Sequence, residues 1–448
     1  MEDTIAAIAT SLGVGAISII RVSGSESIKI VNSIFKGKDL TSQLTHTITY
    51  GHIVEDGKII DEVLVSIMRA PKSFTTEDTV EINCHGGIST TNKVLELLLN
   101  NGCRLAEPGE FTKRAFLNGR IDLIEAEGVM DLINSKTEKA RNLAINQLSG
   151  TSSELIKELR KEIVEILANI EVNIDYPEYD DIVVLSTQII KPQITNIIKK
   201  LKEIINHSEN TKIIKEGIDV LILGRPNVGK SSLLNRLLEE DKAIVTDIEG
   251  TTRDIVEGKI NLDGIILNII DTAGIRQTED VVEKIGVEKS LSLIDKADLV
   301  LFLLNNNEDI TLEDKKIIEQ LKNKNHIIVI NKCDLNKKLN LNDDDCVYIS
   351  AKKNIGIDDL KNKIKELYNL EKIETEDLSY LSSARSISLL KQAMQSLKSA
   401  DKGIDDNYPI DMVEIDIKDS WNILGEIIGE TYEEELIDQL FSQFCLGK

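Results

Sequence analysis

The sequence has few of the residues that mark a secreted, zinc-binding or membrane-spanning protein. Its five cysteines include no Cys-x-x-Cys pair, so neither a disulfide framework nor a zinc site is expected. No run of 18 apolar residues is present, which excludes an ordinary transmembrane helix. The acidic start Met1-Glu2-Asp3 lacks the positive charge of a signal peptide. We therefore expect a cytoplasmic protein with no membrane segment.

Positive charge is also scarce. The chain has 53 Lys and Arg against 76 Asp and Glu, a formal net charge of −23. Binding to phosphate groups relies on clustered Lys and Arg, so any contact with RNA is expected to be local or made by a partner. The whole chain is 41% hydrophobic and 29% charged, as in soluble globular domains. A chain of 448 residues has room for about two to four such domains.

Hydrophobic periodicity predicts a multidomain α/β protein in four segments. Residues 1–118 alternate short β-rich runs with Gly-containing turns and one helix near residues 90–99, which predicts an α+β domain. Residues 119–214 and 372–448 carry apolar residues at helical spacing. Within residues 215–371, five apolar runs alternate with helices, which is typical of a sheet covered on both faces. We expect the two helical segments to form one discontinuous domain into which the α/β domain is inserted.

A phosphate loop is the most specific motif in the chain. Residues 224–231, Gly-Arg-Pro-Asn-Val-Gly-Lys-Ser, follow an apolar strand and precede a helical pattern. In such a loop the backbone amides face the β-phosphate, Lys230 reaches the β and γ phosphates, and the Ser231 hydroxyl ligates Mg²⁺. The sequence therefore predicts a site for a nucleoside triphosphate with Mg²⁺.

Two further motifs can complete the magnesium and γ-phosphate site. Residues 250–253, Gly-Thr-Thr-Arg, offer the Thr252 hydroxyl as a second Mg²⁺ ligand. Residues 271–274, Asp-Thr-Ala-Gly, follow the second apolar strand, where Asp271 can hold the metal through water and Gly274 permits close approach of the backbone. These motifs have the order expected of a Ras-like G domain.

The last two motifs predict the choice of base. In residues 331–334, Asn-Lys-Cys-Asp, the Asp334 carboxylate can accept hydrogen bonds from N1 and N2 of guanine, a donor pair that adenine lacks. Residues 350–352, Ser-Ala-Lys, follow the last strand. Each fragment alone is ordinary on a protein surface, but five in order indicate GTP binding. The residues expected to contact GTP are Asn227, Val228, Gly229, Lys230, Ser231, Ser232, Thr246, Asp247, Ile248, Glu249, Gly250, Thr251, Asp271, Thr272, Ala273, Gly274, Asn331, Lys332, Asp334, Ser350 and Ala351.

The phosphate loop, residues 246–254 and residues 271–276 together resemble the potassium-activated GTPases of the TrmE-Era-EngA-like superfamily. Ile275 stands where Ras-like enzymes have the glutamine that orients water, and no arginine finger is evident. The resemblance implies that K⁺ supplies the missing charge and that Glu283 orients the water. A solvated helix position is the alternative for Glu283. The K⁺ ligands that the resemblance implies are Asn227, Thr246, Ile248 and Thr251.

The flanking segments resemble one family of tRNA-modifying GTPases, called MnmE or TrmE. The motifs that carry this resemblance are residues 3–10, 15–24, 71–78, 84–87, 106–119 and 444–448. The family implies a homodimer whose first domain binds 5-formyl- or methylene-tetrahydrofolate. The folate-binding residues that it implies are Arg21, Glu81, Arg120 and Lys448. Carboxylate and cationic side chains suit the amino edge and the carboxylates of a folate, although a structural ion pair is the alternative for Arg21.

The resemblance also implies a heterotetramer with an FAD-dependent subunit, MnmG. That complex adds a carboxymethylaminomethyl group at carbon 5 of the wobble uridine of certain tRNAs. Because this chain has no flavin motif and little basic charge, we expect the partner to make most of the tRNA contact. Cys445 is either a reactive thiol of the modification site or a buried small hydrophobic residue.

Two other classes of function compete with tRNA modification. A GTP-gated ribosome assembly factor is disfavoured because the chain has no Gly-x-x-Gly loop in a basic C-terminal segment. A folate-binding protein with a vestigial GTPase is disfavoured by the intact nucleotide motifs.

Overall fold

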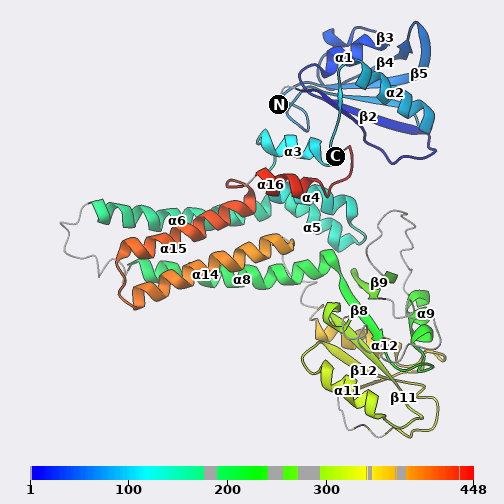
Figure 1. Cartoon of the computed structure of the whole chain (residues 1–448), viewed down its shortest axis with the longest axis vertical. Helices are drawn as coiled ribbons and strands as arrows, with labels where there is room; N and C mark the ends of the chain where they lie inside the picture. The colour runs from blue at the N-terminus through cyan, green and yellow to red at the C-terminus, as the bar shows by residue number, and fades with distance from the viewer. Residues whose placement is uncertain are drawn as a thin grey trace. The chain divides into compact units, whose positions relative to one another are not determined.

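The computed structural model describes residues 3–175, 189–240, 256–270, 293–339, 341, 346–368, 370, 380–432 and 434–447 (Figure 1). Contacts divide the chain into two compact units. The first unit comprises Met1–Met130, Leu148–Val183 and Lys402–Lys448. The second comprises Asp131–Gln147 and Val184–Asp401. None of the helices in the described residues has the length and apolar content needed to cross a membrane.

A seven-stranded sheet organises the N-terminal part of the first unit. Its strands are β1 (Ile5–Ile8), β2 (Ile17–Ser23), β3 (Phe35–Gly37), β4 (Thr47–Glu55), β5 (Lys58–Met68), β6 (Thr79–His85) and β7 (Arg104–Leu105), in the order β3-β4-β5-β6-β2-β1-β7. The helices are α1 (Ser27–Ser33), α2 (Ile88–Asn100) and α3 (Glu110–Leu117), with a 3₁₀ turn at Leu40–Ser42. Alternate residues of β5 and β6 point into the core that α1 and α2 cover, among them Val65, Ile67 and Ile82. This is the α+β domain that the sequence predicts.

Helices from both ends of the sequence lie together in the first unit. They are α4 (Leu123–Asn134), α6 (Thr151–Asp175), α15 (Ile410–Ile428) and α16 (Glu434–Phe441). Helix α6 packs along α15, and the buried Arg160 guanidinium lies 4.2 Å from the centroid of the Trp421 ring. Helix α16 packs on α3 through Phe441 and Phe116, whose ring centroids are 6.2 Å apart. Segments far apart in the sequence therefore share one helical layer.

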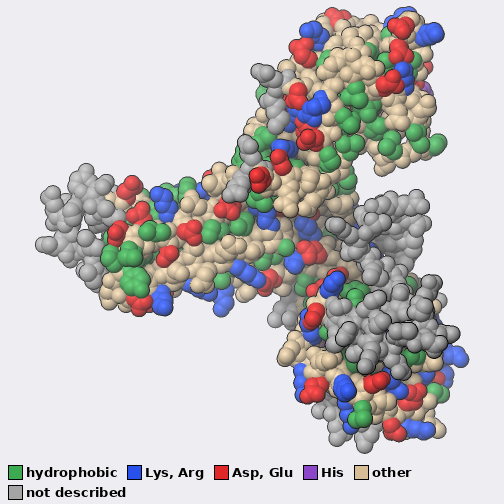
Figure 2. Space-filling view, in the orientation of Figure 1, with side chains coloured by type: hydrophobic (Ala, Val, Ile, Leu, Met, Phe, Trp, Pro, Cys, Tyr) green, Lys and Arg blue, Asp and Glu red, His purple; other side chains and the backbone are tan. Residues whose placement is uncertain are grey.

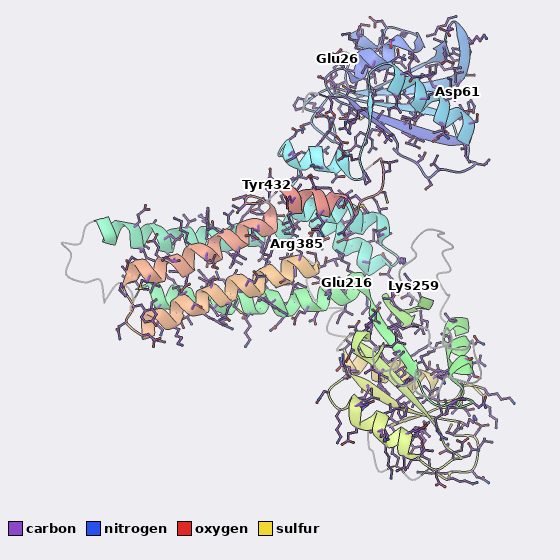
Figure 3. All side chains as sticks on the ribbon, in the orientation of Figure 1. Glu26, Asp61, Glu216, Lys259, Arg385 and Tyr432 are labelled. Carbon is purple, nitrogen blue, oxygen red and sulfur yellow. The ribbon has the colours of Figure 1, made fainter. Side chains whose placement is uncertain are left out.

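In the second unit, α8 (Lys191–Glu216) and most of α5 (Glu138–Leu148) and α14 (Ala384–Asp405) accompany the α/β domain. Helix α8 ends at Glu216, and Gly217 connects it directly to the first strand of the domain (Figure 3). Gly217 has φ 83°, and a Cβ atom there would lie 2.3 Å from the Ile266 oxygen. Only glycine fits this tight junction.

A six-stranded sheet forms the centre of the α/β domain. Its strands are β8 (Ile218–Leu223), β9 (Val256–Leu262), β10 (Ile265–Ile270), β11 (Leu299–Asn305), β12 (His326–Asn331) and β13 (Cys346–Tyr348), in the order β13-β12-β11-β8-β10-β9. Every neighbouring pair is parallel except β9 and β10. The helices are α9 (Lys230–Glu240), α11 (Leu312–Leu321) and α12 (Ile357–Leu367).

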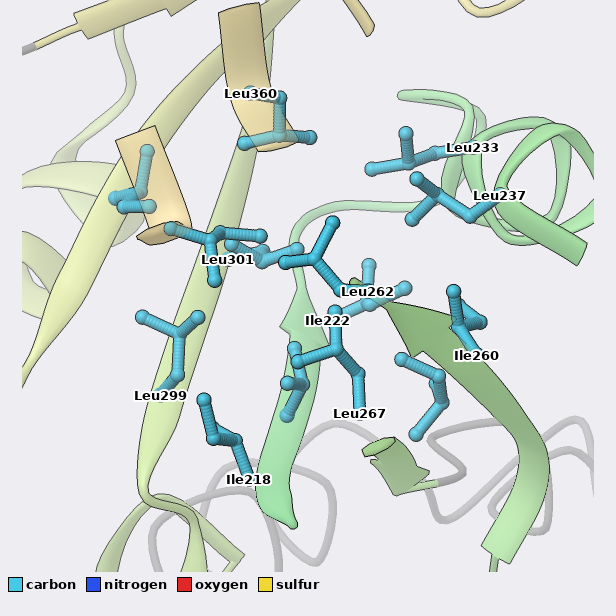
Figure 4. Packing of buried hydrophobic residues seen from close by; sticks show 14 of the residues in the cluster. Ile218, Ile222, Leu233, Leu237, Ile260, Leu262, Leu267, Leu299, Leu301 and Leu360 are labelled. Atoms are coloured by element: carbon cyan, nitrogen blue, oxygen red, sulfur yellow. The ribbon is translucent and has the colours of Figure 1, made fainter. Parts of the chain in front are cut away.

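Both faces of this sheet are buried, as the continuous apolar runs predict. Val220 and Ile222 of β8 pack with α9 and α12 in one core, part of which Figure 4 shows. The alternate residues Leu221 and Leu223 pack with Leu321 of α11 in the other core. The sequence predicted five of the six strands. It missed β9, because Val-Glu-Gly-Lys-Ile-Asn-Leu alternates polar with apolar residues at a sheet edge and is not a continuous apolar run.

Candidate functional site

The phosphate loop connects the end of β8 to the start of α9 and depends on two crowded glycines. Gly224 has φ 155°, and a Cβ atom there would lie 2.6 Å from the Leu303 oxygen. Gly229 has φ 103°, and its Cβ atom would lie 2.2 Å from the Asn331 side-chain nitrogen. Between them Asn227 adopts a left-handed conformation with φ 62°. The loop therefore curls tightly around its own backbone amides, as an anion-binding loop must.

The loop holds its own lysine. Lys230, the first residue of α9, donates from Nζ to the Gly224 oxygen and to the Arg225 oxygen, the latter at 3.0 Å. The ammonium group thus lies against the carbonyl groups of the loop. Ser231 and Ser232 follow in the first turn of α9, where hydroxyl groups and free amides meet at a helix N-terminus.

A single buried asparagine joins three loops. Asn331, at the end of β12, is 3% exposed. Its Nδ2 donates to the Val228 oxygen at 2.8 Å, and its Oδ1 accepts from the backbone amides of Lys332 at 2.8 Å and Ala351 at 3.1 Å. The phosphate loop, the base-recognition loop and the loop after β13 are therefore held in one arrangement.

The Asp334 carboxylate is ionised and ready to accept hydrogen bonds. A hydrogen bond from the Ser350 hydroxyl lowers the pKa of Asp334 below its ordinary value of 3.8, and Lys353 contributes in the same direction. The Lys353 Nζ atom lies 3.3 Å from Asp334 Oδ2. At neutral pH the group is a pure acceptor, which the N1 and N2 donors of guanine require. Sequence reasoning missed Lys353, because nothing in the spacing distinguishes it from the adjacent Lys352.

The structure brings the described members of the predicted GTP site together at the carboxyl ends of β8 and β12 and after β13. Ligands of open α/β sheets bind at this edge. The members that it describes are Asn227, Val228, Gly229, Lys230, Ser231, Ser232, Asn331, Lys332, Asp334, Ser350 and Ala351. The predicted residues that lie outside the described part of the chain are Thr246, Asp247, Ile248, Glu249, Gly250, Thr251, Thr252, Asp271, Thr272, Ala273, Gly274, Glu283 and Lys448.

In the N-terminal domain, two of the predicted folate residues form a cross-strand pair. Arg21 of β2 lies opposite Glu81 of β6. Its Nε and Nη2 atoms lie 2.9 and 2.8 Å from Glu81 Oε1, and the two side chains are 19% and 24% exposed. The ion pair that the structural alternative for Arg21 requires is therefore present, yet both groups reach the surface.

The C-terminal tail contacts the same arginine. Arg21 Nη1 donates to the Gly447 oxygen at 3.3 Å. Gly447 has φ 85°, and a Cβ atom there would lie 2.3 Å from the Ile8 oxygen. The Gly109 amide donates to the Cys445 oxygen at 3.3 Å. The tail is thus fixed on the N-terminal domain by its backbone.

Arg120, the third predicted folate residue that the structure describes, has contacts of its own. Arg120 donates to the Ser73 oxygen at 2.7 Å, and its guanidinium lies 5.1 Å from the centroid of the Phe74 ring. Arg120 is therefore anchored to the 73–74 loop, and the structure shows no contact between it and the Arg21–Glu81 pair among the described residues. The Cys445 side chain is exposed, which contradicts the buried alternative for this residue and leaves its thiol accessible.

Comparisons with known proteins cover the whole chain. The family model for the GTP-binding protein TrmE N-terminus matches residues 4–120, and the model for the MnmE helical domain matches residues 123–445. The tRNA modification GTPase MnmE of Bacillus cytotoxicus is 54% identical over 457 residues, covering 100% of this chain and 99% of the relative. That of Ligilactobacillus salivarius is 52% identical over 455 residues, covering 100% and 98%.

Among solved structures, the G domain of the T. maritima FeoB iron transporter is 26% identical to this chain. The match covers 34% of this chain and 98% of that one, with a TM-score of 0.24. The two family models and the full-length relatives settle the assignment, and the chain belongs to the MnmE family of tRNA modification GTPases.

Proposed function

We propose that the protein is a K⁺-stimulated GTP hydrolase that works with an FAD-dependent partner to modify the wobble uridine of tRNA. The observation that best supports GTP hydrolysis is the way in which the Asn331 side chain connects three loops of the α/β domain. Its side chain fixes the phosphate loop relative to Ala351, and it precedes Asp334 by three residues. One rigid unit can therefore hold the phosphates at one end and the guanine at the other. Pre-organised groups of this kind lower the cost of binding.

The metal ligands that the chain offers suit the ions that the family implies. The described donors are the Ser231 hydroxyl and the Asn227 side-chain oxygen, both hard oxygen ligands of the kind that Mg²⁺ and K⁺ prefer. Asn227 is held in its left-handed conformation by Lys332, which donates to its main-chain oxygen at 2.9 Å. With Ile275 in place of a water-orienting glutamine, a cation bound at Asn227 supplies charge to the phosphates.

The catalytic acid in this proposal is Glu283, which is proposed to orient the attacking water. If Glu283→Ala binds GTP normally but loses most of its turnover, the role stands. Full GTP turnover by the variant would instead support the alternative, in which Glu283 is a solvated helix residue without a catalytic role.

Folate binding is proposed at the Arg21–Glu81 pair. Because both groups are partly exposed and the Gly447 carbonyl lies beside them, a pterin could exchange the ion pair for bonds to its own polar edge. Arg120 and Lys448 are proposed to meet the folate carboxylates, and the exposed Cys445 thiol is proposed as a reactive group of the modification site. Binding of 5-formyltetrahydrofolate to wild type and Arg21→Ala, measured by calorimetry, tests this site.

The open face of the N-terminal sheet supports a homodimer. Ile48, Tyr50 and Leu64 are 68%, 58% and 47% exposed, and Tyr50 and Leu64 are cross-strand neighbours. Hydrophobic side chains reach the surface of this domain in Figure 2. Leu64 also lies opposite Asn83, which shares its strand face with Glu81. A second copy that covers this apolar face would therefore border the proposed folate site.

The modification itself is tested by reconstitution. Purified protein, the FAD-dependent partner, GTP, a methylene-tetrahydrofolate, unmodified tRNA and either glycine or ammonium as the nitrogen source are combined in KCl, and the wobble nucleoside is analysed by mass spectrometry. The proposal predicts a carbon-5 adduct that requires every component. GTP turnover without any adduct would contradict the tRNA-modification part of the proposal and support only the GTPase part.

A further inference from the structure

The phosphate loop is anchored from outside the nucleotide site by a side chain to which its motif assigns no role. Arg225 follows Gly224, and its guanidinium reaches the start of α11. Its Nε atom lies 3.3 Å from Asp314 Oδ2 and its Nη2 atom 3.1 Å from Glu308 Oε2. Because this side chain is paired with Asp314 and Glu308, it is not positioned as an arginine finger on the γ-phosphate.

The side chain of Asp314 is fully buried and held by several hydrogen bonds. Its side chain is 0% exposed. Its Oδ2 accepts from the amide and the hydroxyl of Thr311 at 2.9 and 2.8 Å, and the Thr311 hydroxyl accepts from the Asp314 amide at 3.2 Å. This capping box starts α11, whose Leu321 packs into the sheet core. A buried carboxylate is costly unless a cation lies beside it, and Arg225 places its guanidinium there.

The main chain of Arg225 belongs to the nucleotide site. Its carbonyl oxygen accepts from Lys230 Nζ at 3.0 Å. Two residues further on, Asn227 has the left-handed conformation that presents its carbonyl to Lys332. Residues 225–227 therefore combine main-chain contacts within the nucleotide site with a side chain that is paired outside it.

We propose that Arg225 is a positioning residue for GTP hydrolysis. Its ion pair with Asp314 holds residues 225–227 so that Lys230 and Asn227 meet the phosphates in one geometry. The inference rests on the proposed function, because it concerns the same GTP site. A shift of about 1 Å in a positioned group can lower the rate of a reaction about 100-fold, so loss of the anchor is expected to lower kcat as well as affinity.

The test compares GTP turnover and GDP affinity in full-length wild type, Arg225→Met, Arg225→Lys, Asp314→Asn and the double variant Arg225→Met/Asp314→Asn. Methionine keeps the length of the side chain and removes its charge. We expect Arg225→Met to lower kcat by about 10-fold or more and Arg225→Lys to recover part of the loss. The double variant is expected to be no worse than Arg225→Met, because both changes remove the same contact.

A matched control removes another ion pair of the same domain. Lys365 of α12 pairs with Asp263, away from the phosphate loop, so Lys365→Met is expected to keep wild-type turnover. If Asp314→Asn fails to fold, the comparison of wild type with Arg225→Lys, Arg225→Met and Glu308→Gln still tests the positioning role. A graded fall of kcat along the Arg, Lys, Met series with small changes in the melting temperature is the expected result.

Two negative outcomes are distinguishable. A wild-type protein that does not hydrolyse GTP would contradict the proposed function itself. An active wild type with Arg225→Met unchanged in kcat and KM would overturn the positioning role alone. Additive losses in the double variant would also overturn it, because they would show that Arg225 and Asp314 act independently.

Discussion

Lys332 donates a hydrogen bond from Nζ to the main-chain oxygen of Asn227 at 2.9 Å, which joins the base-recognition loop directly to the phosphate loop. Asn331 makes a second connection in parallel, to the Val228 oxygen at 2.8 Å. The loop that carries Asp334 is therefore connected to the phosphate loop through the same pair of adjacent residues.

This junction predicts the effect of Asn331→Ala. The change removes three hydrogen bonds from a buried position. At about 1 kcal/mol for each bond the expected loss is about 3 kcal/mol, or roughly 100-fold in affinity for both GDP and GTP. Titration with a fluorescent GDP analogue measures it. Unchanged affinity for the diphosphate would show that the loops keep their arrangement without this side chain.

Base choice should change when the carboxylate of Asp334 is replaced. In Asp334→Asn the side chain presents an amide donor toward the N2 amino group of guanine, where two donors repel. We expect affinity for GTP to fall by at least about 100-fold, whereas xanthosine triphosphate, with an oxygen at that position, should bind better than GTP. Competition between the two nucleotides checks this. Retained preference for GTP would place the recognition of the base elsewhere.

The C-terminal tail should depend on Gly447. In Gly447→Ala the new Cβ atom would meet the Ile8 oxygen at 2.3 Å, in a backbone with φ 85°. We expect a cost of about 1 to 3 kcal/mol, release of the tail from Arg21 and weaker binding of tetrahydrofolate.

Gly57 offers the matched control for this change. It has φ 80°, but nothing lies within 4 Å of a Cβ atom built there. Gly57→Ala therefore introduces the backbone strain without the clash, and folate affinity should stay at the wild-type value. Equal losses of affinity in both variants would contradict a role for the docked tail.

A buried charge network predicts a strong effect for Arg114→Met. Arg114 is 1% exposed and pairs with Asp3 at 2.8 Å, Glu110 at 2.9 Å and Glu77 at 3.2 Å. Removing it takes the cation from Glu77 and leaves Asp3 and Glu110 with Arg104 alone, and breaking a buried ion pair typically costs about 3 to 5 kcal/mol. Native-state hydrogen exchange of the β6 amides reports the local free energy of opening. Unaltered protection would show that the remaining Arg104 compensates.

The same network predicts loss of stability in acid. Burial raises the pKa of the Glu110 carboxyl, but hydrogen bonds from Arg104 and Arg114 outweigh this effect and hold the pKa below its ordinary value of 4.5. A hydrogen bond from Arg104 likewise lowers the pKa of Asp3 below 3.8. A carboxyl whose pKa is lowered on folding contributes its stability above the unfolded pKa and loses it as the pH falls through the folded pKa. Protection of β6 should therefore fall below about pH 4.5 in wild type, and part of this fall should remain in Arg114→Met, because Arg104 still pairs with Asp3 and Glu110.

The features that could be predicted from the sequence are those with a strong local residue pattern. Residues 224–231 indicated the phosphate loop because glycine spacing, a preceding apolar strand and a following helix coincide, and the cross-strand neighbours Arg21 and Glu81 were both expected from resemblance. The Arg225–Asp314 ion pair was missed, since its partners are 89 residues apart in the numbering and neither position has a periodic pattern. The docking of Gly447 against Ile8 was missed for the same reason, because tertiary contacts of a tail leave no trace in local spacing.

GTP turnover by the purified protein in KCl and in NaCl at equal ionic strength, with Asn227→Ala measured alongside, tests the central claim most directly. The account predicts that K⁺ accelerates turnover by about tenfold or more, which is about 1.4 kcal/mol of the barrier, and that the variant loses this acceleration while it still binds GDP. Equal rates in both salts, or full K⁺ stimulation of Asn227→Ala, would contradict it.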